Sequence, residues 1–290
     1  MQRFIQRVFI FIFIIITIVV IDLGLQNYLL FKDEDLKLPK EYNTLILGHS
    51  HSAFAYNDKY IKNTLNLSEL GEAYMYTYFK SKKIIESNPQ IKRVYIEFTN
   101  NQIYKKDMNT WMWGDAQLQY RIKRYGVILD KEALQILYDK NATGLINAFS
   151  KSLFDNLVRF FYDNKDIVLH GGMGRYTPSV KILKETSPNK KRKHLKDISE
   201  YNIVYLQKII KYCQDRNIQV CLVRSPMHKN FDISFSENKF KTILHTKFKN
   251  VVWLDNKNFP LSDKSFQDLE HLNSSGAKIY SQYFNNQINK

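Results

Sequence analysis

A short apolar segment runs directly into a cluster of polar side chains in "NTLILGHSHS", residues 43–52. Because its centre is a purely apolar triplet, the segment 43–48 predicts a strand that is covered on both faces, as strands of parallel sheets are. Two histidines then alternate with two serines after Gly48. Ligands of open parallel sheets bind beyond the carboxyl ends of the strands, so this cluster predicts a functional site.

Further apolar segments alternate with amphipathic ones along the chain. The predicted strands cover 43–48, 63–68, 92–100, 218–226 and 251–255, and the predicted helices cover 70–88, 197–217, 237–250 and 273–288. This alternation is typical of an α/β fold with a parallel sheet and crossover helices. We expect one such domain over residues 43–290, with an aromatic insertion at about 101–196 that shapes or covers the ligand crevice.

Residues 1–30 predict a membrane anchor. The apolar run that ends at Leu25 has about the length that spans a bilayer, and no cleavage motif of small residues follows it, so we expect an uncleaved helix. Arg3 and Arg7 precede the run, which predicts a cytoplasmic N-terminus and an exported domain, in the periplasm or outside the cell. Residues 31–42 would be a polar tether.

The chain is strongly basic, with 43 Lys and Arg against 28 Asp and Glu and a net charge of +15. Such a surface suits nucleic acid, anionic lipid or an acidic polysaccharide. The densest basic run, residues 189–196, contains no aromatic residue and predicts a solvated loop, and we expect no nucleic-acid partner. The two cysteines, Cys213 and Cys221, predict ordinary buried thiols.

Three predicted strand ends together carry the groups that acyl transfer needs. Ser50 is a hydroxyl at a strand-to-helix turn, and the spacing of Asp268 and His271 lets the carboxylate reach Nδ1 while Nε2 faces outward. The backbone N–H of Ser50, the side-chain amide of Asn100 and the backbone after Gly71 are candidate donors to an oxyanion. The residues therefore predict a serine nucleophile with a histidine base and an aspartate partner.

These motifs resemble those of the SGNH (GDSL-like) hydrolases. The first block of that family reads G-D-S-x-S/T, and "GHSHS" is similar to it with His49 in place of Asp; the last block, D-x-x-H, matches "DLEH". The third block, G-x-N-D, is half kept in "FTNN", where Phe98 and Asn101 replace Gly and Asp, and Gly71 is the nearest candidate for the second block. The resemblance covers residues 43–100 and 197–288.

The resemblance implies a flavodoxin-like three-layer α/β/α sandwich with a five-stranded parallel sheet. It implies that Ser50 is the nucleophile, His271 the base and Asp268 its orienting partner, and that Asn100 and Gly71 complete the oxyanion hole with the Ser50 N–H. Membrane-tethered members such as DltD-like and alginate-acetylation-like proteins act on envelope polymers. We therefore expect an esterase or O-acyltransferase for an acylated envelope glycan, with a membrane partner that could deliver the acyl donor, and no cofactor.

Further residues near the expected crevice are candidates for substrate binding. His49 and His51 flank Ser50, and Asn101 follows the third strand. Arg224 after the fourth strand would either hold an anionic group of the substrate or pair with a carboxylate. Trp111 and Trp113 would either pack in the core or a lid, or offer aromatic faces to a sugar.

The same residues also fit two other classes of protein. His49, His51, Asp268 and His271 form a plausible set of zinc ligands, which would make the protein a metal-dependent hydrolase. A non-catalytic glycan-binding or assembly factor with this fold would keep the same strand ends. Turn formation and helix capping also account for each motif taken alone.

Overall fold

The computed structural model describes residues 1–32, 36–162 and 197–289, and it divides the chain into two compact units. One unit comprises Met1–Leu36 and Trp113–Val168, and the other comprises Lys37–Met112 and Leu169–Lys290. The predicted basic loop at 189–196 and part of the predicted insertion therefore lie outside the described residues. The described start of that insertion belongs to the unit that contains the sheet, whereas its described residues 113–162 group with the N-terminal helix.

The sheet unit contains five parallel strands. They are β1 (Thr44–Leu47), β2 (Thr64–Asn66), β3 (Arg93–Glu97), β4 (Gln219–Arg224) and β5 (Val252–Asp255). Their order in the sheet is β2-β1-β3-β4-β5, and every pair of neighbours is parallel. This is the flavodoxin-like order, in which β2 lies on one side of β1 and the later strands are added on the other side. The predicted five-stranded parallel sheet is confirmed.

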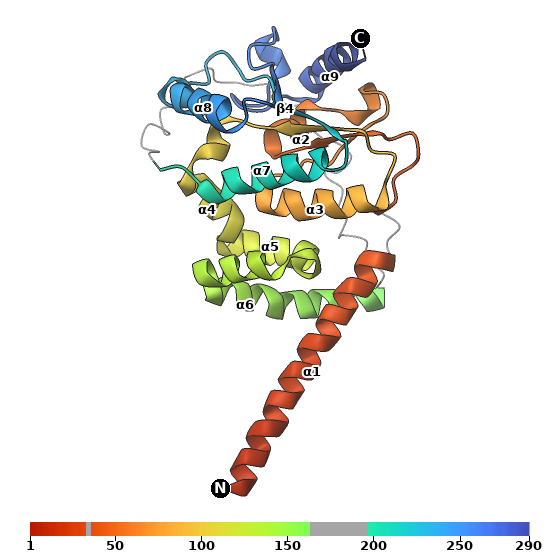
Figure 1. Cartoon of the computed structure of the whole chain (residues 1–290), viewed down its shortest axis with the longest axis vertical. Helices are drawn as coiled ribbons and strands as arrows, with labels where there is room; N and C mark the ends of the chain where they lie inside the picture. Colours follow the sequence, from red (N-terminus) through yellow and green to blue (C-terminus); the bar gives the residue numbers. More distant parts are fainter. Residues whose placement is uncertain (33–35, 163–196, 290) are drawn as a thin grey trace. The chain divides into compact units, whose positions relative to one another are not determined.

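Helices cover both faces of the sheet and make a three-layer sandwich (Figure 1). One face carries α3 (Tyr74–Ser87), α7 (Glu200–Gln214) and α8 (Ser234–Lys247), and the other carries α2 (Ser50–Ala55) and α9 (Ser274–Ile288). Side chains alternate between the faces, so Ile46, Tyr95 and Val223 point to the layer of α9, where they pack in a cluster with Tyr280 and Phe284. The predicted helices lie within a few residues of the observed ones.

Strand β3 is shorter than the predicted segment 92–100. The ladder with β4 ends at Glu97, and the chain turns at Thr99 into the short 3₁₀ helix η3 (Asn100–Ile103). Thr99 and Gln102 cap this helix reciprocally, since each side chain bonds to the backbone of the other. The helix α4 (Lys105–Trp113) follows, with the 3₁₀ turns η2 (Asp58–Tyr60) and η7 (Asp263–Ser265) elsewhere in the same unit. The early end of β3 decides where Asn100 and Asn101 point.

The other unit is helical. It consists of α1 (Gln2–Lys32), α5 (Asp115–Tyr125), the turn η4 (Gly126–Ile128) and α6 (Lys131–Tyr162). Helix α6 is interrupted at Asn141, whose side chain accepts the Gly144 N–H and so caps the second half of the helix. Within α1, residues Gln2–Leu25 form a segment that is long and apolar enough to cross a membrane, as predicted for the N-terminus.

Candidate active site

Gly48 is the residue that lets strand β1 turn directly into helix α2. Its φ is +156°, and a Cβ at this position would lie 2.4 Å from Ser52 Oγ and 2.5 Å from Glu97 Cβ. No other residue fits without displacing its neighbours. The tight turn makes Ser50 the first residue of α2, where the backbone N–H has no partner within the helix.

Ser50, His271 and Asp268 lie within hydrogen-bond distance of one another. Ser50 Oγ is 2.8 Å from His271 Nε2, and His271 Nδ1 is 2.9 Å from Asp268 Oδ2. The serine and the histidine are 221 residues apart in the sequence, and the strand order brings their two loops together. The geometry is that of a nucleophile, a base and a group that orients the base.

The loop that carries Asp268 holds its carboxylate in place. Asp268 Oδ1 accepts the backbone N–H groups of Glu270 at 2.8 Å and of His271 at 2.9 Å. Partial burial opposes ionisation, but the hydrogen bond and the charge of His271 together with these backbone donors lower the pKa of the Asp268 carboxyl below its ordinary value. Asp268 is therefore ionised at neutral pH, which favours the tautomer of His271 with its proton on Nδ1.

The N-terminus of α9 anchors the same loop. Asn273 caps the helix by accepting the N–H groups of Ser275 and Gly276, and its own amide donates to the Lys264 carbonyl at 2.7 Å. A Cβ on Gly276 would lie 2.1 Å from the Ser265 carbonyl oxygen, so helix and loop approach as closely as a glycine allows. The cap of α9 and the loop that carries Asp268 and His271 are therefore held together.

His49 links Ser50 to the end of strand β3. Its Nδ1 accepts the His51 backbone N–H at 3.4 Å and lies 3.4 Å from Ser50 Oγ. Its Nε2 is 3.0 Å from Thr99 Oγ1, and that hydroxyl donates to Asn101 Oδ1. Since the Thr99 hydrogen is used on Asn101, this network assigns the His49 proton to Nε2. His49 is buried in this network and does not line a surface that a large substrate could reach.

His51 is buried between two other imidazoles. Its ring centroid is 4.6 Å from that of His49 and 5.1 Å from that of His271. Its Nε2 lies 3.3 Å from Glu270 Oε2. His51 therefore packs beside the base of the triad and ties helix α2 to the loop that carries Asp268.

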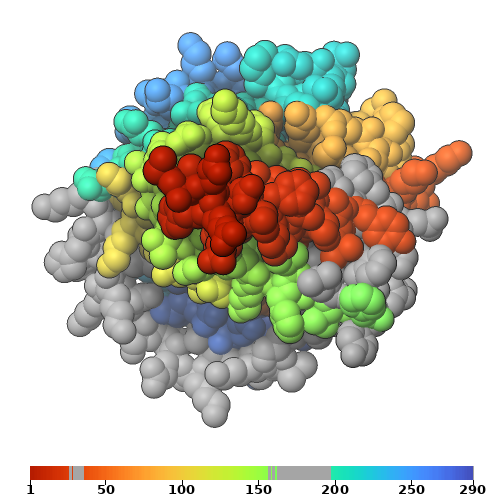
Figure 2. Space-filling model, turned by 90° about the horizontal axis from the view of Figure 1, so that it is seen from below, coloured from red at the N-terminus to blue at the C-terminus, as the bar shows by residue number. Residues whose placement is uncertain are grey.

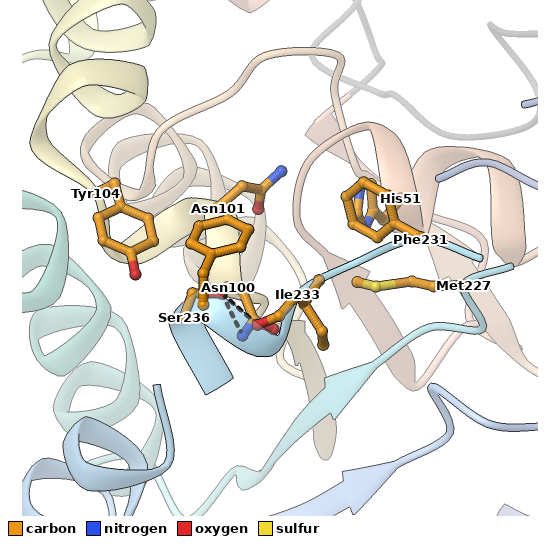
Figure 3. Close-up of a pocket in the computed structure, with 9 residues that line it drawn as sticks. His51, Asn100, Asn101, Tyr104, Met227, Phe231, Ile233 and Ser236 are labelled. Atoms are coloured by element: carbon orange, nitrogen blue, oxygen red, sulfur yellow. Dashed lines mark hydrogen bonds between the residues drawn. The ribbon is translucent and has the colours of Figure 1, made fainter. Parts of the chain in front are cut away.

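The two neighbouring asparagines after β3 differ from expectation. The Asn100 amide donates to Ser236 Oγ at 3.1 Å and to Glu237 Oε2 at 3.0 Å, so it is already engaged and is not available to an oxyanion. Figure 3 shows this amide directed to Ser236, whereas the amide nitrogen of Asn101 points away from that residue. Of the two, Asn101 is the better placed donor, because Thr99 holds its oxygen and leaves its nitrogen outward.

Gly71 lies in the turn between β2 and α3. Its φ of +57° is in the left-handed region, which favours glycine. The next residue, Glu72, forms a fully buried ion pair with Lys80, whose Nζ also donates to the Leu67 carbonyl at 2.6 Å. Since β2 and β3 flank β1, this turn and the Asn101 turn lie on either side of the β1 end that carries Ser50.

Arg224 is buried and fully committed to neighbouring side chains. Its guanidinium pairs with Asp255, with Glu237 at 2.9 Å and with the Asn100 oxygen at 2.9 Å. Burial opposes ionisation of Glu237, but its bonds to Arg224 and Asn100 lower the pKa of that carboxyl to about 2. Of the two predicted roles, the structure has the pairing with carboxylates, and Arg224 is not available to a substrate anion.

The two tryptophans belong to different units of the structure. Trp111 lies in the sheet unit, with its ring centroid 5.4 Å from that of His49 and its side chain partly exposed. Trp113 begins the second segment of the helical unit, and its carbonyl accepts from Asn141 at 2.8 Å. Trp111 is thus beside the candidate site.

A narrow pocket adjoins His51 (Figure 3). Its space suits about one water molecule or methyl group. His51 and Asn101 contribute its polar side, and the loop after β4 supplies much of its apolar side. The complete lining is His51, Asn100, Asn101, Tyr104, Met227, Phe231, Ile233, Phe235 and Ser236.

Glu97 is a second buried carboxyl at this edge of the sheet, and the sequence pattern did not indicate it. It receives the Ser225 backbone N–H at 3.0 Å and bonds to the Ser225 hydroxyl. Complete burial raises the pKa of Glu97 to about 7, although the bonds to Ser225 act in the opposite direction. The apolar residues of the pocket were also missed, although several of them follow the end of β4, which was a usable signal.

The alternative set of zinc ligands is not assembled. In the part of the chain that the structure describes, no group of three or more His, Cys, Asp and Glu side chains has an arrangement that could hold a metal ion. His49 Nε2 is engaged with Thr99, and His271 Nδ1 with Asp268. The cluster is instead arranged for hydrogen bonding around one hydroxyl.

Comparison with known proteins adds little to this geometry. One protein-family model, which carries no descriptive name, matches residues 176–290, less than half of the chain. No curated protein matches the sequence. A function for this chain is therefore inferred from its own residues and their geometry.

Proposed function

We propose that the protein is a serine acyl-ester hydrolase or O-acyltransferase of the SGNH type. The observation that carries the proposal is the pair of hydrogen bonds from Ser50 to His271 at 2.8 Å and from His271 to Asp268 at 2.9 Å. Both lie in the range in which a base can remove the proton of a hydroxyl. The departure of "GHSHS" from the usual motif of the family affects the neighbour of the nucleophile and not the triad itself.

The proposed reaction has two steps. Ser50 Oγ attacks the carbonyl carbon of an ester while its proton passes to His271 Nε2, and the same proton then goes to the leaving alkoxide, which departs as an alcohol. Water, or a hydroxyl of an acceptor, gives a proton to His271 and attacks the acyl-serine. Ser50 then takes that proton back, and a free acid or a new ester leaves.

The negative charge that forms on the carbonyl oxygen needs fixed donors. We assign these to the Ser50 N–H, the Gly71 N–H and, in place of Asn100, the amide of Asn101. In support, Ser50 begins a helix, and Gly71 and Asn101 follow the two strands that flank β1. Removing one such donor in other enzymes lowers kcat by roughly 10²–10³-fold.

The substrate proposed is an acyl ester on an envelope glycan, with transfer to a glycan preferred over hydrolysis. The support is the apolar N-terminal segment, which suits a membrane anchor, and Arg3 and Arg7 before it, which favour a cytoplasmic N-terminus and an exported catalytic unit. The narrow pocket beside His51 suits a short acyl group. A membrane partner that delivers the acyl donor would complete a transferase.

Ester hydrolysis by the full chain in detergent tests the proposal. With p-nitrophenyl acetate as substrate, Ser50→Ala and His271→Ala should each lower kcat/KM by at least about 10³-fold, because the residues act as a unit. Ser234→Ala and His245→Ala, both exposed on α8, are matched controls that should retain the native rate. Hydrolysis by the native protein no faster than by Ser50→Ala would contradict the proposal, and retained biological activity in Ser50→Ala would instead indicate a binding factor.

A further inference from the structure

Helix α1 presents apolar side chains on every side along the segment that could span a membrane. Phe9 and Phe13 are 68% and 69% exposed, and most other residues of Gln2–Leu25 are also exposed. Asp22 is the exception, since it is buried near the carboxyl end of this segment. The apolar part of α1 therefore needs lipid around it, and its protein contacts begin at about the level of Asp22.

Helix α6 packs against α1 within the helical unit. Figure 1 shows α6 beside the end of α1 that is far from the N-terminus, and Figure 2, seen along α1 from below, shows the surface of α5 and α6 around it. The turn η4 also contacts α1. The position of α6 is therefore close to the point where the apolar segment of α1 ends.

The second half of α6 is apolar on two faces. One face is buried, with Leu145 and Ala148 among its residues. The other face is exposed and carries Ile146, Phe154 and Val158, of which Phe154 is 67% exposed. At 100° per residue these three side chains lie within about 120° of one another, so they form one stripe along the helix, which also includes the exposed polar residues Asn147 and Ser150. Phe161, also exposed, continues the stripe.

An exposed apolar stripe on a helix indicates a partner surface. Here the stripe lies on a helix that packs against α1, which needs lipid, and α6 lies near the level at which α1 leaves the hydrocarbon. Lys151, an exposed cation at the edge of the stripe, suits the anionic headgroups found at that depth. A bilayer surface accounts for both features of α6 together.

We propose that the exposed face of the second half of α6, defined by Ile146, Phe154 and Val158, lies in the headgroup and upper acyl region of the membrane that α1 crosses. The helical unit is then held by one spanning helix and one interfacial helix. Two such attachments restrict rotation of this unit about α1, which a single flexible anchor would not do.

Single-cysteine labelling of the full chain tests this proposal. Ile146→Cys and Phe154→Cys carry an environment-sensitive fluorophore in proteoliposomes of phosphatidylethanolamine and phosphatidylglycerol. Ile279→Cys on α9, a comparably exposed apolar site in the sheet unit, is the matched control. The native cysteines are buried, and the unsubstituted protein treated with the same reagent measures their background.

The labels at 146 and 154 should emit at shorter wavelength than the label at 279, and lipids with a spin label high on the acyl chain should quench them. Emission and quenching equal to those of the control would overturn the proposal. Short-wavelength emission without quenching by lipid would also overturn it, since a second copy or another protein would then cover the stripe. Circular dichroism establishes that both substituted chains retain the native fold, and agreement of two independent sites is required.

Discussion

Single residues at the strand ends decide what this site can do. His49 joins Ser50 to Thr99 through its two ring nitrogens, and Thr99 in turn binds Asn101. The sequence alone could not tell that the Asn100 amide binds Ser236 and Glu237, whereas the Asn101 oxygen binds Thr99. This difference depends on the early end of β3 and the turn into η3, which set neighbouring side chains in different directions.

Asn101→Ala and Asn100→Ala separate these two roles. Asn101→Ala should lower kcat by roughly 10²-fold or more, with little change in KM or thermal stability, because an oxyanion donor acts only in the transition state. Asn100→Ala should instead lower the melting temperature, because it removes partners from buried Arg224 and Glu237. Ester-hydrolysis kinetics and thermal unfolding of both variants make the comparison. A larger loss of kcat in Asn100→Ala would reverse the assignment.

Glu97 gives the stability of the protein a pH dependence. Its pKa is about 7 in the folded protein against 4.5 as the ordinary value, so the folded state holds the proton more tightly. This contribution is complete below about pH 4.5 and is lost as pH rises through 7; a shift of this size corresponds to about 3 kcal/mol. Glu97→Gln has a side chain of the same shape that can still bond to Ser225 but does not titrate. It should therefore remove this loss of stability between pH 5 and 8.

Thermal unfolding of the native chain and Glu97→Gln at several pH values tests this expectation. The difference in stability should grow in favour of Glu97→Gln as pH rises. Parallel stability profiles for the two proteins would show that Glu97 does not titrate in this range.

At the scale of elements, packing between helix α9 and the loop before it sets the position of His271. The strands were predictable because apolar runs and their spacing depend on short stretches of sequence. The network around Arg224 could not be predicted in this way, because Asn100, Glu237 and Asp255 reach Arg224 from three separate elements. The sequence pattern indicates which residue types stand at the strand ends. Which of these side chains pair with one another depends on the three-dimensional arrangement.

Gly276→Ala tests the role of this contact. The added methyl group would collide with the Ser265 backbone, so the loop must move, at a cost of about 1–3 kcal/mol. We expect a lower melting temperature and a lower kcat, because the loop also carries Asp268 and His271. Ser275→Ala, an exposed neighbour on the same helix, is the control and should leave both unchanged. If Gly276→Ala showed native kinetics, the contact between α9 and the loop would not be required for the position of His271.

At the scale of the whole molecule, the chain joins a three-layer α/β unit to a helical unit that contains the apolar N-terminal helix. The sequence predicted the sheet and the anchor, but it treated residues 101–196 as one insertion. The structure assigns α4 up to Met112 to the sheet unit and residues from Trp113 to the unit of α1. That division depends on contacts between α1, α5 and α6, which no local pattern reveals.

The expected export of the sheet unit is testable with a reporter. A green fluorescent protein that folds only in the cytoplasm, fused after Lys290, should stay dark, because Arg3 and Arg7 favour a cytoplasmic N-terminus. Replacing both arginines by glutamine and adding lysines after residue 32 should raise the fluorescence. Bright cells with the native sequence would place the domain in the cytoplasm and contradict the proposed envelope substrate.

The central claim is that His271 activates Ser50. The most direct test is intact-mass analysis of the full chain after reaction with a fluorophosphonate, followed by peptide mapping. We expect one adduct per chain, located on Ser50. It should be absent from Ser50→Ala, form much more slowly in His271→Ala and form at the native rate in His245→Ala. An adduct on another serine, or labelling of Ser50 at the same rate without His271, would contradict it.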